Sequence, residues 1–501
     1  MANFKQKILL RSKIIDISTG SPWIVTLHEI DARRYGVRAG DTLSLKWRTR
    51  LTTITVDLTT SLVRPGQAGL FKEIEKIYKI KNNELLEFEL LGSPSSLKVI
   101  QKKLLSKKLT YQEIFSVMKD ITDYKLDDLS IAFFVSAFFF KRPSLEEIYY
   151  LTKAMAETGY MFNFKGKVLD KHSTGGLAGN RVTPIIVAII GSLGLCIPKT
   201  SSRAVTSAAG TADTFEVLAP VTFKAKQVKK IVKEHGACIV WGSEEIAPAD
   251  ERIIKVAYRL NIEPYSKMVV SIMAKKVAMG IKYLVIDIPI NPTAKITSLV
   301  EAKKIKSLFV YLAKKFKIKI NVTINYAADP VGKGIGPVLE ARDVLRVLQQ
   351  KKNHPQDLET KAVKLSGYLL ELAGEAKKGQ GKKMARKTLC SFKAWRKMQE
   401  IIKAQGGNSN IDSEEIKPGK IVFEKKAVKK GEIKSIQSKN LAEICRLLGA
   451  PFIKKAGVYL NKSVGEKAKK GETLFTLYTV SRQRLDLARE GLKKLRIYQI
   501  K

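Results

Sequence analysis

The chain has 501 residues, of which 45% are hydrophobic and 8% aromatic. This length corresponds to about three domains with buried cores, and the composition excludes a largely disordered chain. The formal net charge of +43 arises from 90 Lys and Arg residues against 47 Asp and Glu residues. The excess is spread along the chain, without a Cys/His finger or an aromatic-rich RNA-binding motif. We therefore interpret it as solvated basic surface and expect no specific nucleic-acid partner.

Cysteine and histidine usage bears on the compartment and on metal binding. Four cysteines are scattered without CxxC spacing, at Cys196, Cys238, Cys390 and Cys445. Such thiols are typical of a reducing compartment, so we expect a cytoplasmic protein. The N-terminal sequence MANFKQKILLRSK has no apolar leader segment, and the chain has only four histidines. We therefore expect neither a signal peptide nor a histidine-built metal site.

Residues 1–90 are predicted to form a β-rich domain. Segments such as KILLRSKIID, PWIVTLHE and ELLEFELLG have strand character, and glycine-containing breaks separate them. From residue 91 the pattern becomes helical. Thr110 with Glu113, and Ser144 with Glu147, have the spacing of capping boxes. The apolar segment between them, DDLSIAFFVSAFFF, predicts a buried helix.

From about residue 163, short apolar runs alternate with helical segments. ACIVWG, YLVIDIPI and IKINVTI are rich in β-branched residues, which predicts an α/β domain. The uncharged run 182–198 contains Pro and Gly and predicts a buried core helix rather than a membrane span. Residues 376–387 and 404–410 are predicted to be surface loops. Strands and turns then return, with one helix near residues 439–448.

Residues 170–181, DKHSTGGLAGNR, are the first candidate binding segment. Gly175 and Gly176 let the backbone approach an anion closely, and Lys171, Ser173 and Thr174 supply a positive charge and two hydroxyls. The apolar run that follows would place a helix N-terminus beside the loop, where free N–H groups favour phosphate. A glycine-rich loop is also found in simple turns, so this segment alone does not decide the function.

Residues 199–213, KTSSRAVTSAAGTAD, are the second candidate segment. They combine many hydroxyls and Arg203 with almost no bulky apolar side chain, which suits a polyanionic ligand. The alternative is a helix of small residues packed closely against another helix. A binding function requires the two segments to meet in space and form a cradle for an anion.

Together the two segments resemble a known family. DKHSTGG followed by PKTSSRAVTSAAGTADT is similar to the thymidine phosphorylase family, and the form SSRAVTSAAGT is that of its AMP phosphorylase branch. The β-rich segment before residue 90 is also a mark of this branch. Further similar segments extend the resemblance over nearly the whole chain: APADERII (247–254), SIMAKKVAMG (271–280), IDIPI (286–290), GKGIGPVLEARDVLRVL (332–348) and AGVYLNKSVGEKAKKGETLFTLY (456–478).

The resemblance implies an α/β fold class with a helical domain and a large α/β domain that enclose a cleft. An N-terminal β-rich domain and a C-terminal α+β domain flank these two. The domain boundaries expected on this basis are 1–90 for the β-rich domain, 91–162 and 176–230 for the helical domain, 163–175 and 231–410 for the α/β domain, and 411–501 for the C-terminal domain.

The resemblance also implies roles for individual residues. Phosphate would be bound by residues of both segments and of the helix between them: Lys171, Ser173, Thr183, Ser201 and Thr211. The nucleotide would be bound by a partly overlapping set: Gly176, Ser202, Arg203, Ala204, Val205, Thr206, Ser207, Thr211, Ser271 and Lys295.

Two residues are candidates for the acid that protonates the leaving base. Glu263 lies in LNIEP, where the AMP branch has an Asp proton donor within a segment like LSLDP. A glutamate can do this chemistry, and a closed, partly dry site would raise its pKa toward neutrality. His172 matches a histidine that approaches the base in pyrimidine-nucleoside relatives. A surface position for Glu263 and a loop-bracing role for His172 are the alternatives.

The resulting expectation is reversible phosphorolysis of AMP, and of other nucleoside 5′-monophosphates, to free base and ribose 1,5-bisphosphate. Phosphate is the co-substrate, and no cofactor, metal or membrane partner is expected. One alternative is a thymidine or pyrimidine-nucleoside phosphorylase that yields a pentose 1-phosphate. However, the arginine that contacts the pyrimidine ring in pyrimidine-nucleoside relatives has no clear counterpart around residues 255–257. A second alternative is a catalytically inactive nucleic-acid-binding protein. The resemblance implies a homodimer or a larger homo-oligomer.

Overall fold

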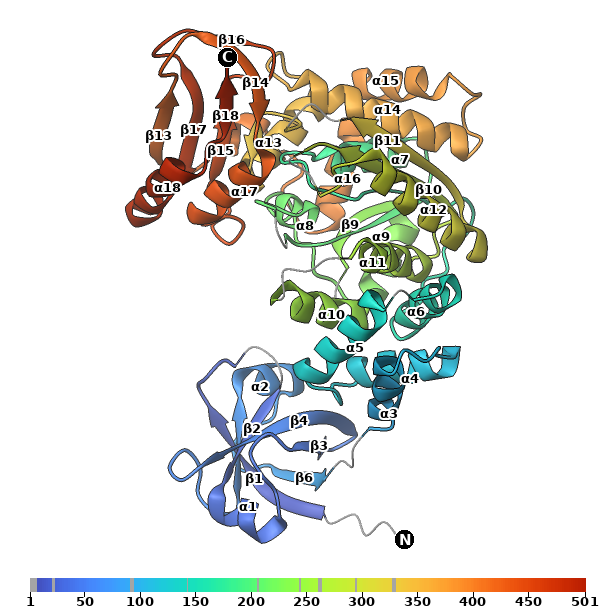
Figure 1. The fold of residues 1–501 in the computed structure, drawn as a ribbon, viewed down its shortest axis with the longest axis vertical. Coiled ribbons are helices and arrows are strands. Elements are labelled where there is room, and N and C mark those ends of the chain that lie inside the picture. The colour runs from blue at the N-terminus through green and yellow to red at the C-terminus, as the bar shows by residue number, and fades with distance from the viewer. Residues whose placement is uncertain are drawn as a thin grey trace. The chain divides into compact units, whose positions relative to one another are not determined.

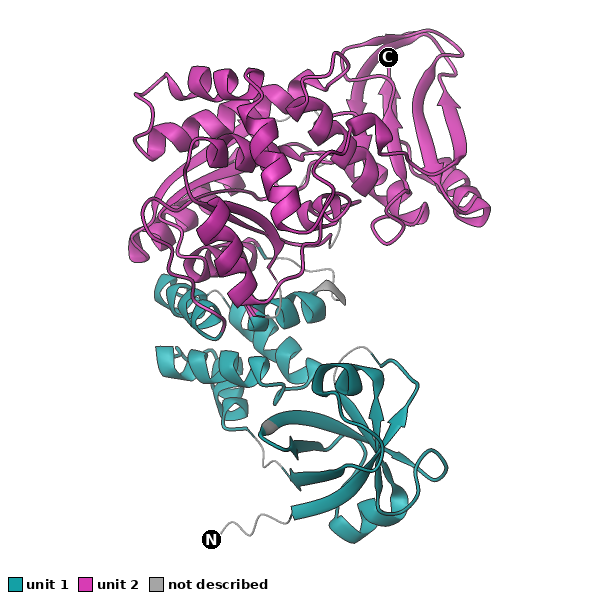
Figure 2. Ribbon diagram, turned by 180° about the vertical axis from the view of Figure 1, so that it is seen from behind, with its two compact units in different colours: residues 1–158, 248–264 teal, residues 159–247, 265–501 magenta. Residues whose placement is uncertain are grey.

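The computed structural model describes residues 7–19, 23–90, 94–141, 143–204, 207–242, 245–259, 264–292, 295–326 and 330–501. The chain divides into two compact units (Figure 2). The first unit comprises Met1–Thr158 and Pro248–Pro264, and the second comprises Gly159–Ala247 and Tyr265–Lys501. Each unit is described by itself below.

The N-terminal segment of the first unit forms a closed β-barrel (Figure 1). This confirms that the segment is β-rich, as the alternating sequence pattern predicted, and the closure of the strands into a barrel is a finding of the structure. Alternate residues of its first strand, among them Ile8 and Leu10, fill the barrel interior. Helices α1 (Glu29–Tyr35) and α2 (Lys72–Tyr78) follow two of the strands. The strands pair in the order β1 (Lys7–Ile15), β5 (Gln67–Phe71), β2 (Ile24–His28), β4 (Arg50–Thr59), β3 (Thr42–Trp47) and β6 (Leu85–Leu90).

Helices form the rest of the first unit: α3 (Ser96–Leu104), α4 (Tyr111–Thr122), α5 (Asp128–Phe140), α6 (Leu145–Glu157) and α10 (Pro248–Arg259). Both predicted capping boxes are present, at the starts of α4 and α6. The α10 side chain Arg252 donates hydrogen bonds of 2.8 and 3.1 Å to the carbonyl oxygens of Ile121 and Leu126. These bonds fix α10 to α4 and to the turn before α5, which lie far from α10 along the chain.

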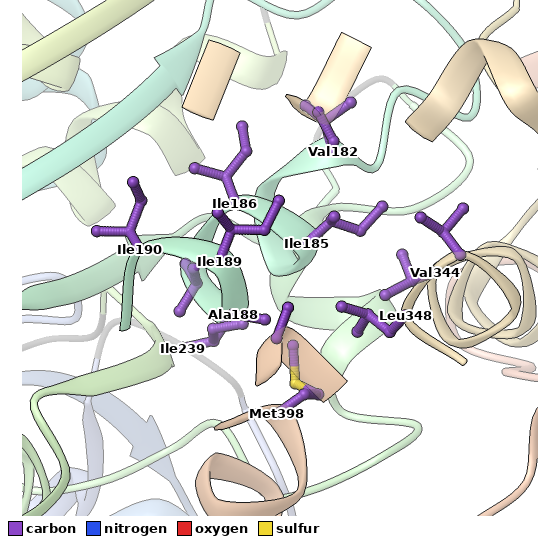
Figure 3. Packing of buried hydrophobic residues seen from close by; sticks show 14 of the residues in the cluster. Val182, Ile185, Ile186, Ala188, Ile189, Ile190, Ile239, Val344, Leu348 and Met398 are labelled. Carbon is purple, nitrogen blue, oxygen red and sulfur yellow. The ribbon is translucent and has the colours of Figure 1, made fainter. Parts of the chain in front are cut away.

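The second unit contains residues 176–230, which differs from the boundary expected from the sequence. The reason is the packing of α7 (Val182–Ser192), in which every residue from Val182 to Gly191 is buried. Figure 3 shows Ile185 and Ile189 of this helix within the same cluster as Val344, Met398 and Ile239. A helix that is apolar all round has to lie inside a core, and α7 does so in the second unit. Among the described residues, no helix has both the length and the hydrophobicity needed to cross a membrane.

Parallel strands form the centre of the second unit. β11 (Lys319–Tyr326), β10 (Tyr283–Ile290) and β7 (Leu169–Ser173) make one sheet, and β8 (Ile197–Ser201) pairs with β9 (Ala237–Trp241). A parallel bridge between Val168 and Cys196 connects β7 to β8. The carboxyl ends of all these strands therefore point toward the same edge.

Helices separate the strands along the chain, as the predicted α/β alternation requires. They are α7, α8 (Thr211–Phe215), α9 (Ala225–His235), α11 (Tyr265–Ala278), α12 (Leu299–Lys315), α13 (Pro337–Leu348), α14 (Gln356–Leu372), α15 (Gly381–Cys390) and α16 (Lys393–Ala404). The loop prediction for residues 376–387 is wrong in part, because α15 begins at Gly381. A Cβ on Gly381 would lie 2.2 Å from the carbonyl oxygen of Gly367, so this glycine lets α15 pack directly on α14.

The C-terminal part is an α+β module, and the helix predicted near residues 439–448 is α17 (Ser438–Leu447). A short strand from the preceding segment, β12, completes one of its sheets and so joins the module to the α/β domain. That sheet has the order β12 (Gly334–Ile335), β15 (Gly457–Leu460), β17 (Thr473–Thr479) and β13 (Ile421–Lys426). The remaining elements are β16 (Lys467–Ala468), β14 (Gly431–Ile436), β18 (Tyr498–Ile500) and α18 (Arg482–Lys494).

Candidate active site

The two candidate binding segments start at the same edge of the α/β domain. β7 ends at Ser173 and β8 ends at Ser201, and the two strands run parallel. The loops that follow them therefore leave from the carboxyl edge, which is where open parallel sheets bind ligands. The sequence patterns alone did not establish this arrangement.

The glycines of the first loop have specific backbone roles. Gly175 and Gly176 have φ angles of 83° and 93°, a left-handed conformation that side chains disfavour. Gly179 also has a positive φ, and a Cβ there would lie 2.4 Å from the carbonyl oxygen of Val331. The loop from Thr174 to Asn180 therefore needs glycine both for its turns and for its close packing.

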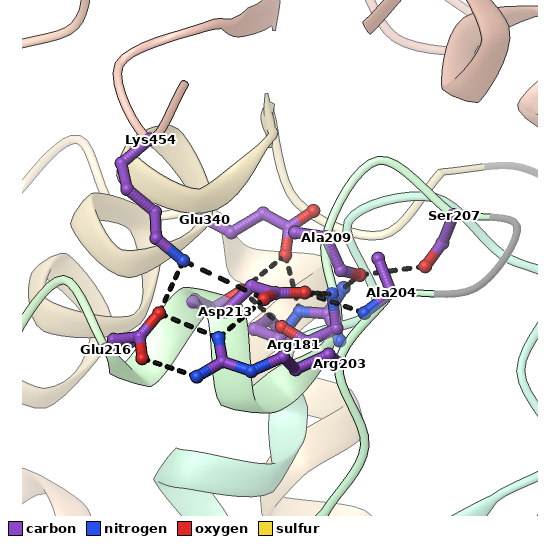
Figure 4. Close-up of polar contacts among 11 residues, drawn as sticks. Arg181, Arg203, Ala204, Ser207, Ala209, Asp213, Glu216, Glu340 and Lys454 are labelled. Atoms are coloured by element: carbon purple, nitrogen blue, oxygen red, sulfur yellow. Dashed lines mark hydrogen bonds and ion pairs between the residues drawn. The ribbon is translucent and has the colours of Figure 1, made fainter. Parts of the chain in front are cut away.

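Arg181, at the end of the first segment, contacts the second segment directly (Figure 4). Its guanidinium group donates hydrogen bonds of 3.2 Å to Thr211 Oγ1 and 2.8 Å to the carbonyl oxygen of Ala209. The same group pairs with the buried carboxylate of Glu340 on α13. The two segments thus meet in space, as the binding hypothesis requires.

Lys171 lies beside a buried carboxylate on one face of β7. Asp287 of β10 accepts hydrogen bonds from Ser173 Oγ (3.3 Å) and Asn325 Nδ2 (3.1 Å), and its ion pair with Lys361 of α14 is 3.0 Å long. Burial lowers the pKa of Lys171 to about 8, against the opposing effect of the Asp287 carboxylate. Lys171 and Lys361 carry two positive charges against the single negative charge of Asp287, and a bound anion would balance this excess.

A second group of lysines surrounds Asp170 on the other face of β7. Lys199 donates hydrogen bonds to Asp170 Oδ1 (3.1 Å) and to the carbonyl oxygen of Lys171 (2.9 Å), and Lys276 of α11 lies 2.6 Å from Asp170 Oδ2. Burial alone would raise the pKa of Asp170, but the two ammonium groups hold it below its usual value. Burial lowers the pKa of Lys276 to about 7. Both faces of β7 therefore place more cations than anions near the first candidate segment, residues 170–181.

The candidate acid His172 is half-buried on β7 between these groups. Burial lowers its pKa well below 6.5, and the charges of Lys276 and Lys199 lower it further. The imidazole is thus neutral at neutral pH. In that state it can form hydrogen bonds, but it does not carry the extra proton that a general acid would give to a leaving base.

Arg203, expected at the nucleotide, is held by carboxylates. Its guanidinium group donates two hydrogen bonds to Glu216, of 2.8 and 2.6 Å, and one of 3.2 Å to Asp213. Lys454 of the C-terminal module also binds Glu216, at 2.6 Å (Figure 4). Asp213 further accepts the backbone N–H of Ala204 at 2.7 Å. Arg203 is therefore held against α8 and the residue that follows it, and Glu216 links this group to the C-terminal module through Lys454.

Several expected hydroxyls lie along the same edge. Ser201 is buried, and its hydroxyl has no hydrogen-bond partner within the described part of the protein. Buried hydroxyls without partners are rare, so a ligand at this edge would satisfy this group. Thr183 is buried in the first turn of α7. Lys275 Nζ lies 3.3 Å from Ser271 Oγ on α11, and the lysine chain packs against Gly242 after β9.

The structure describes some of the remaining expected positions but not all of them. Ser202 and Lys295 are exposed, and Ser207 donates a 2.9 Å hydrogen bond to the carbonyl oxygen of Ala209. Gly176 is half-buried in the first loop. Three expected positions, Val205, Thr206 and Glu263, lie outside the described residues.

Sequence reasoning missed most of the charged residues that surround the candidate segments. Lys361 and Asn325 follow no motif, and only the three-dimensional packing of α14 and β11 brings them to Asp287. Arg181 was inside the first segment but received no role. Asp287 was inside the similar segment IDIPI, and its charge in an otherwise apolar strand was the available signal. In the described residues, no group of three His, Cys, Asp or Glu side chains is arranged to hold a metal ion.

Comparison with known proteins agrees with this architecture. The chain matches the helical bundle domain of a glycosyl transferase family at residues 97–159 and its a/b domain at 165–394. Residues 432–499 match the pyrimidine nucleoside phosphorylase C-terminal domain. AMP phosphorylase from Pyrococcus furiosus is 40% identical over 478 residues, which cover 95% of this chain and 94% of that protein. The chain belongs to the AMP phosphorylase family.

Other members of the AMP phosphorylase family align over a similar length. The Thermococcus kodakarensis protein is 40% identical, with 95% of this chain and 94% of that protein covered. The Methanocaldococcus jannaschii protein is 37% identical, with 99% and 97% covered. The solved structure of anthranilate phosphoribosyltransferase from Thermus thermophilus shares the fold, with a TM-score of 0.52 at 18% identity, over 61% of this chain and 99% of that one. Family and fold place the chain among enzymes that transfer glycosyl groups.

Proposed function

We propose that this enzyme cleaves AMP, and other nucleoside 5′-monophosphates, by phosphorolysis to free base and ribose 1,5-bisphosphate. The observation that carries the proposal is the contact of the two hydroxyl-rich segments through Arg181 and Thr211. It brings a segment expected to bind phosphate into direct contact with a segment expected to bind the nucleotide, which supports a shared binding edge. Relatives of this chain at 37–40% identity carry the name AMP phosphorylase.

In the proposed reaction, a phosphate oxygen attacks C1′ of the ribose while the bond from C1′ to the base nitrogen breaks. Positive charge develops on the ribose, and the electron pair of the broken bond leaves with the base. Phosphate is held by Lys171 and by the surrounding hydroxyls, namely Ser173, Thr183, Ser201 and Thr211. Preorganised donors of this kind lower the barrier because they need no reorientation during the reaction.

A proton must reach the departing base, and Glu263 is the proposed donor. The neutral state of His172 supports this choice, because a neutral imidazole is a poor general acid. The nucleotide is proposed to lie along Gly176, the 202–207 run, Ser271 and Lys295. The scheme needs phosphate as co-substrate and no further cofactor. We further propose that the enzyme acts as a cytoplasmic homo-oligomer in nucleotide metabolism.

The direct test is chromatography of the free base released by the purified enzyme from AMP, with and without phosphate. We expect adenine to appear only when phosphate is present, together with an equal amount of ribose 1,5-bisphosphate. Thymidine and adenosine in parallel reactions should give much lower rates. No consumption of phosphate with AMP, CMP or UMP would overturn the proposal, and a preference for thymidine would assign a nucleoside phosphorylase instead.

A further inference from the structure

Arg181 lies where three segments of the second unit meet. It is the last residue of the 170–181 segment and precedes α7 directly. Its guanidinium group reaches Thr211 and Ala209 of the 199–213 segment, and Glu340 of α13 (Figure 4). No role in binding or catalysis is assigned to this arginine by the motif resemblance.

Glu340 holds this arginine in one place. The carboxylate is almost fully buried, with 1% of its side chain exposed, and the arginine side chain is 11% exposed. Glu340 also accepts a hydrogen bond of 2.9 Å from Thr214 Oγ1 and one of 3.2 Å from the backbone N–H of Gly336. The arginine charge is thus balanced inside the protein, so its function is to position other groups rather than to bind an anion itself.

The contact with Thr211 fixes the direction of a hydroxyl group. A guanidinium group can only donate hydrogen bonds, so Thr211 Oγ1 is the acceptor in the 3.2 Å contact with Arg181. The hydrogen of the Thr211 hydroxyl is then left to be donated to a ligand. The positive charge of Arg181 also polarises this hydroxyl, which strengthens its hydrogen bond to an anion.

We propose that Arg181 is a positioning residue that couples phosphate binding to nucleotide binding. Thr211 is the one residue expected at both ligands, and the Arg181 side chain ties it by a hydrogen bond to the phosphate loop, of which Arg181 is itself the last residue. A phosphate that orders the 170–181 segment therefore also orders Thr211 for the nucleotide. By thermodynamic linkage, a nucleotide bound at Thr211 favours phosphate binding to the same extent. This inference rests on the proposed function, because it takes phosphate and a nucleoside 5′-monophosphate as the two ligands.

The test compares Arg181→Met and Arg181→Lys with a matched control, Arg346→Met. Arg346 is also a buried arginine held by a carboxylate, with contacts of 2.7 and 2.9 Å to Glu414, but its guanidinium hydrogen bonds go to neither candidate segment. We expect Arg181→Met to raise the KM values for phosphate and for AMP about tenfold or more, as the loss of an oriented, charge-assisted hydrogen bond would. Arg181→Lys should recover part of this loss, and Arg346→Met should lower thermal stability while leaving both KM values unchanged.

Binding measurements test the coupling itself. AMP is titrated into each protein with and without sulfate, an unreactive substitute for phosphate. In the wild-type enzyme sulfate should tighten AMP binding, and in Arg181→Met this effect should disappear. Thr211→Val should remove the same coupling. The double variant Arg181→Met/Thr211→Val should bind AMP in the presence of sulfate no more weakly than Arg181→Met alone.

The outcomes separate this inference from the proposed function. Wild-type enzyme that releases no adenine from AMP and phosphate would overturn the proposed function. Active wild-type enzyme whose Arg181→Met variant keeps normal KM values, or behaves like Arg346→Met, would overturn the role of Arg181 alone. Additive effects of the Arg181 and Thr211 substitutions on AMP binding in the presence of sulfate would also overturn the proposed role of Arg181.

Discussion

Ser173 donates a 3.3 Å hydrogen bond to Asp287, its register partner on the neighbouring parallel strand. The charge of the fully buried Asp287 carboxylate is balanced by Lys361 at 3.0 Å, and Asn325 donates a hydrogen bond of 3.1 Å to it. The single hydroxyl hydrogen of Ser173, a residue expected to bind phosphate, is therefore given to this carboxylate, and the hydroxyl has to turn away from Asp287 on binding in order to donate to phosphate. Lys171 and Lys361 outnumber this carboxylate, so its charge would not repel an anion bound at the neighbouring candidate loop.

The first prediction follows from this contact. Asp287→Asn keeps the size of the side chain, but it removes the carboxylate that favours the charged form of Lys171 and pairs with Lys361, so less of Lys171 carries the positive charge that holds phosphate. We expect the KM for phosphate to rise about tenfold, which corresponds to about 1.4 kcal/mol of binding free energy. Initial rates at varied phosphate and saturating AMP measure this change. Asp486→Asn, which alters only an exposed ion pair with Arg489, is the control and should leave the KM unchanged.

The second prediction concerns pH. Burial lowers the pKa of Lys171 to about 8, so the ammonium form dominates below pH 8 and is lost above it. Phosphate binding needs this positive charge, so the KM for phosphate should rise about twofold from pH 7 to 8, where half of the charge is lost, and by up to about tenfold per pH unit above that. Lys171→Arg keeps its charge over this range because the guanidinium pKa exceeds about 12. A rise that persists unchanged in Lys171→Arg would show that another group titrates.

The division into strands and helices could be predicted from the sequence because it depends on local patterns. The alternation of apolar and polar residues predicted strands in the segment that forms the barrel, and capping boxes marked the starts of α4 and α6. The assignment of α10 and of residues 176–230 to their units could not be predicted in this way. It depends on contacts between segments far apart in the chain, such as those of Arg252 with Ile121 and Leu126.

The candidate site shows the same limit. Glycines and hydroxyls are recognisable in a motif because they act through the local backbone, and the 170–181 segment was chosen as a candidate in this way. Lys361 reaches the site from a helix whose sequence carries no signal for it, since surface and buried lysines look alike in a lysine-rich chain. Lys276 lies in the similar segment SIMAKKVAMG, but that segment did not indicate its contact with Asp170. The start of α15 was missed for a related reason. Gly381 reads as a loop residue, but it allows close contact with Gly367 of α14.

The third prediction separates the two candidate proton donors. Glu263→Gln removes the ionisable group and should lower kcat about 100-fold or more, a typical contribution of a general acid. Glu263→Asp restores the residue of the AMP branch and should retain most of the activity. His172→Gln should lower kcat much less and leave its pH dependence between about pH 6 and 8 unchanged, because the imidazole is already neutral there. Loss of the alkaline limb of the kcat profile in His172→Gln would instead identify the histidine as the donor, because a general acid loses activity as the pH rises through its pKa.

The fourth prediction concerns the contribution of the lysine cluster around Asp170 to the stability of the fold. Asp170 balances Lys199 and Lys276, and all three side chains are at most 3% exposed. Asp170→Asn would leave two buried cations without their counter-ion, so we expect the free energy of unfolding to fall by about 3–5 kcal/mol in urea denaturation at about pH 7. Asp123→Asn removes a surface ion pair with Lys119 and should cost less than about 1 kcal/mol.

The pH dependence of the same denaturation identifies the cause. The two ammonium groups hold the pKa of Asp170 below its usual value, so its carboxylate stabilises the fold above a pH of about 4. This contribution is lost as the pH falls through the lowered pKa, because the protonated acid no longer balances the lysines. The difference in stability between wild type and Asp170→Asn should therefore shrink at low pH. A difference that stays constant from neutral pH down to acid unfolding would mean that the substitution disturbs packing rather than charge balance.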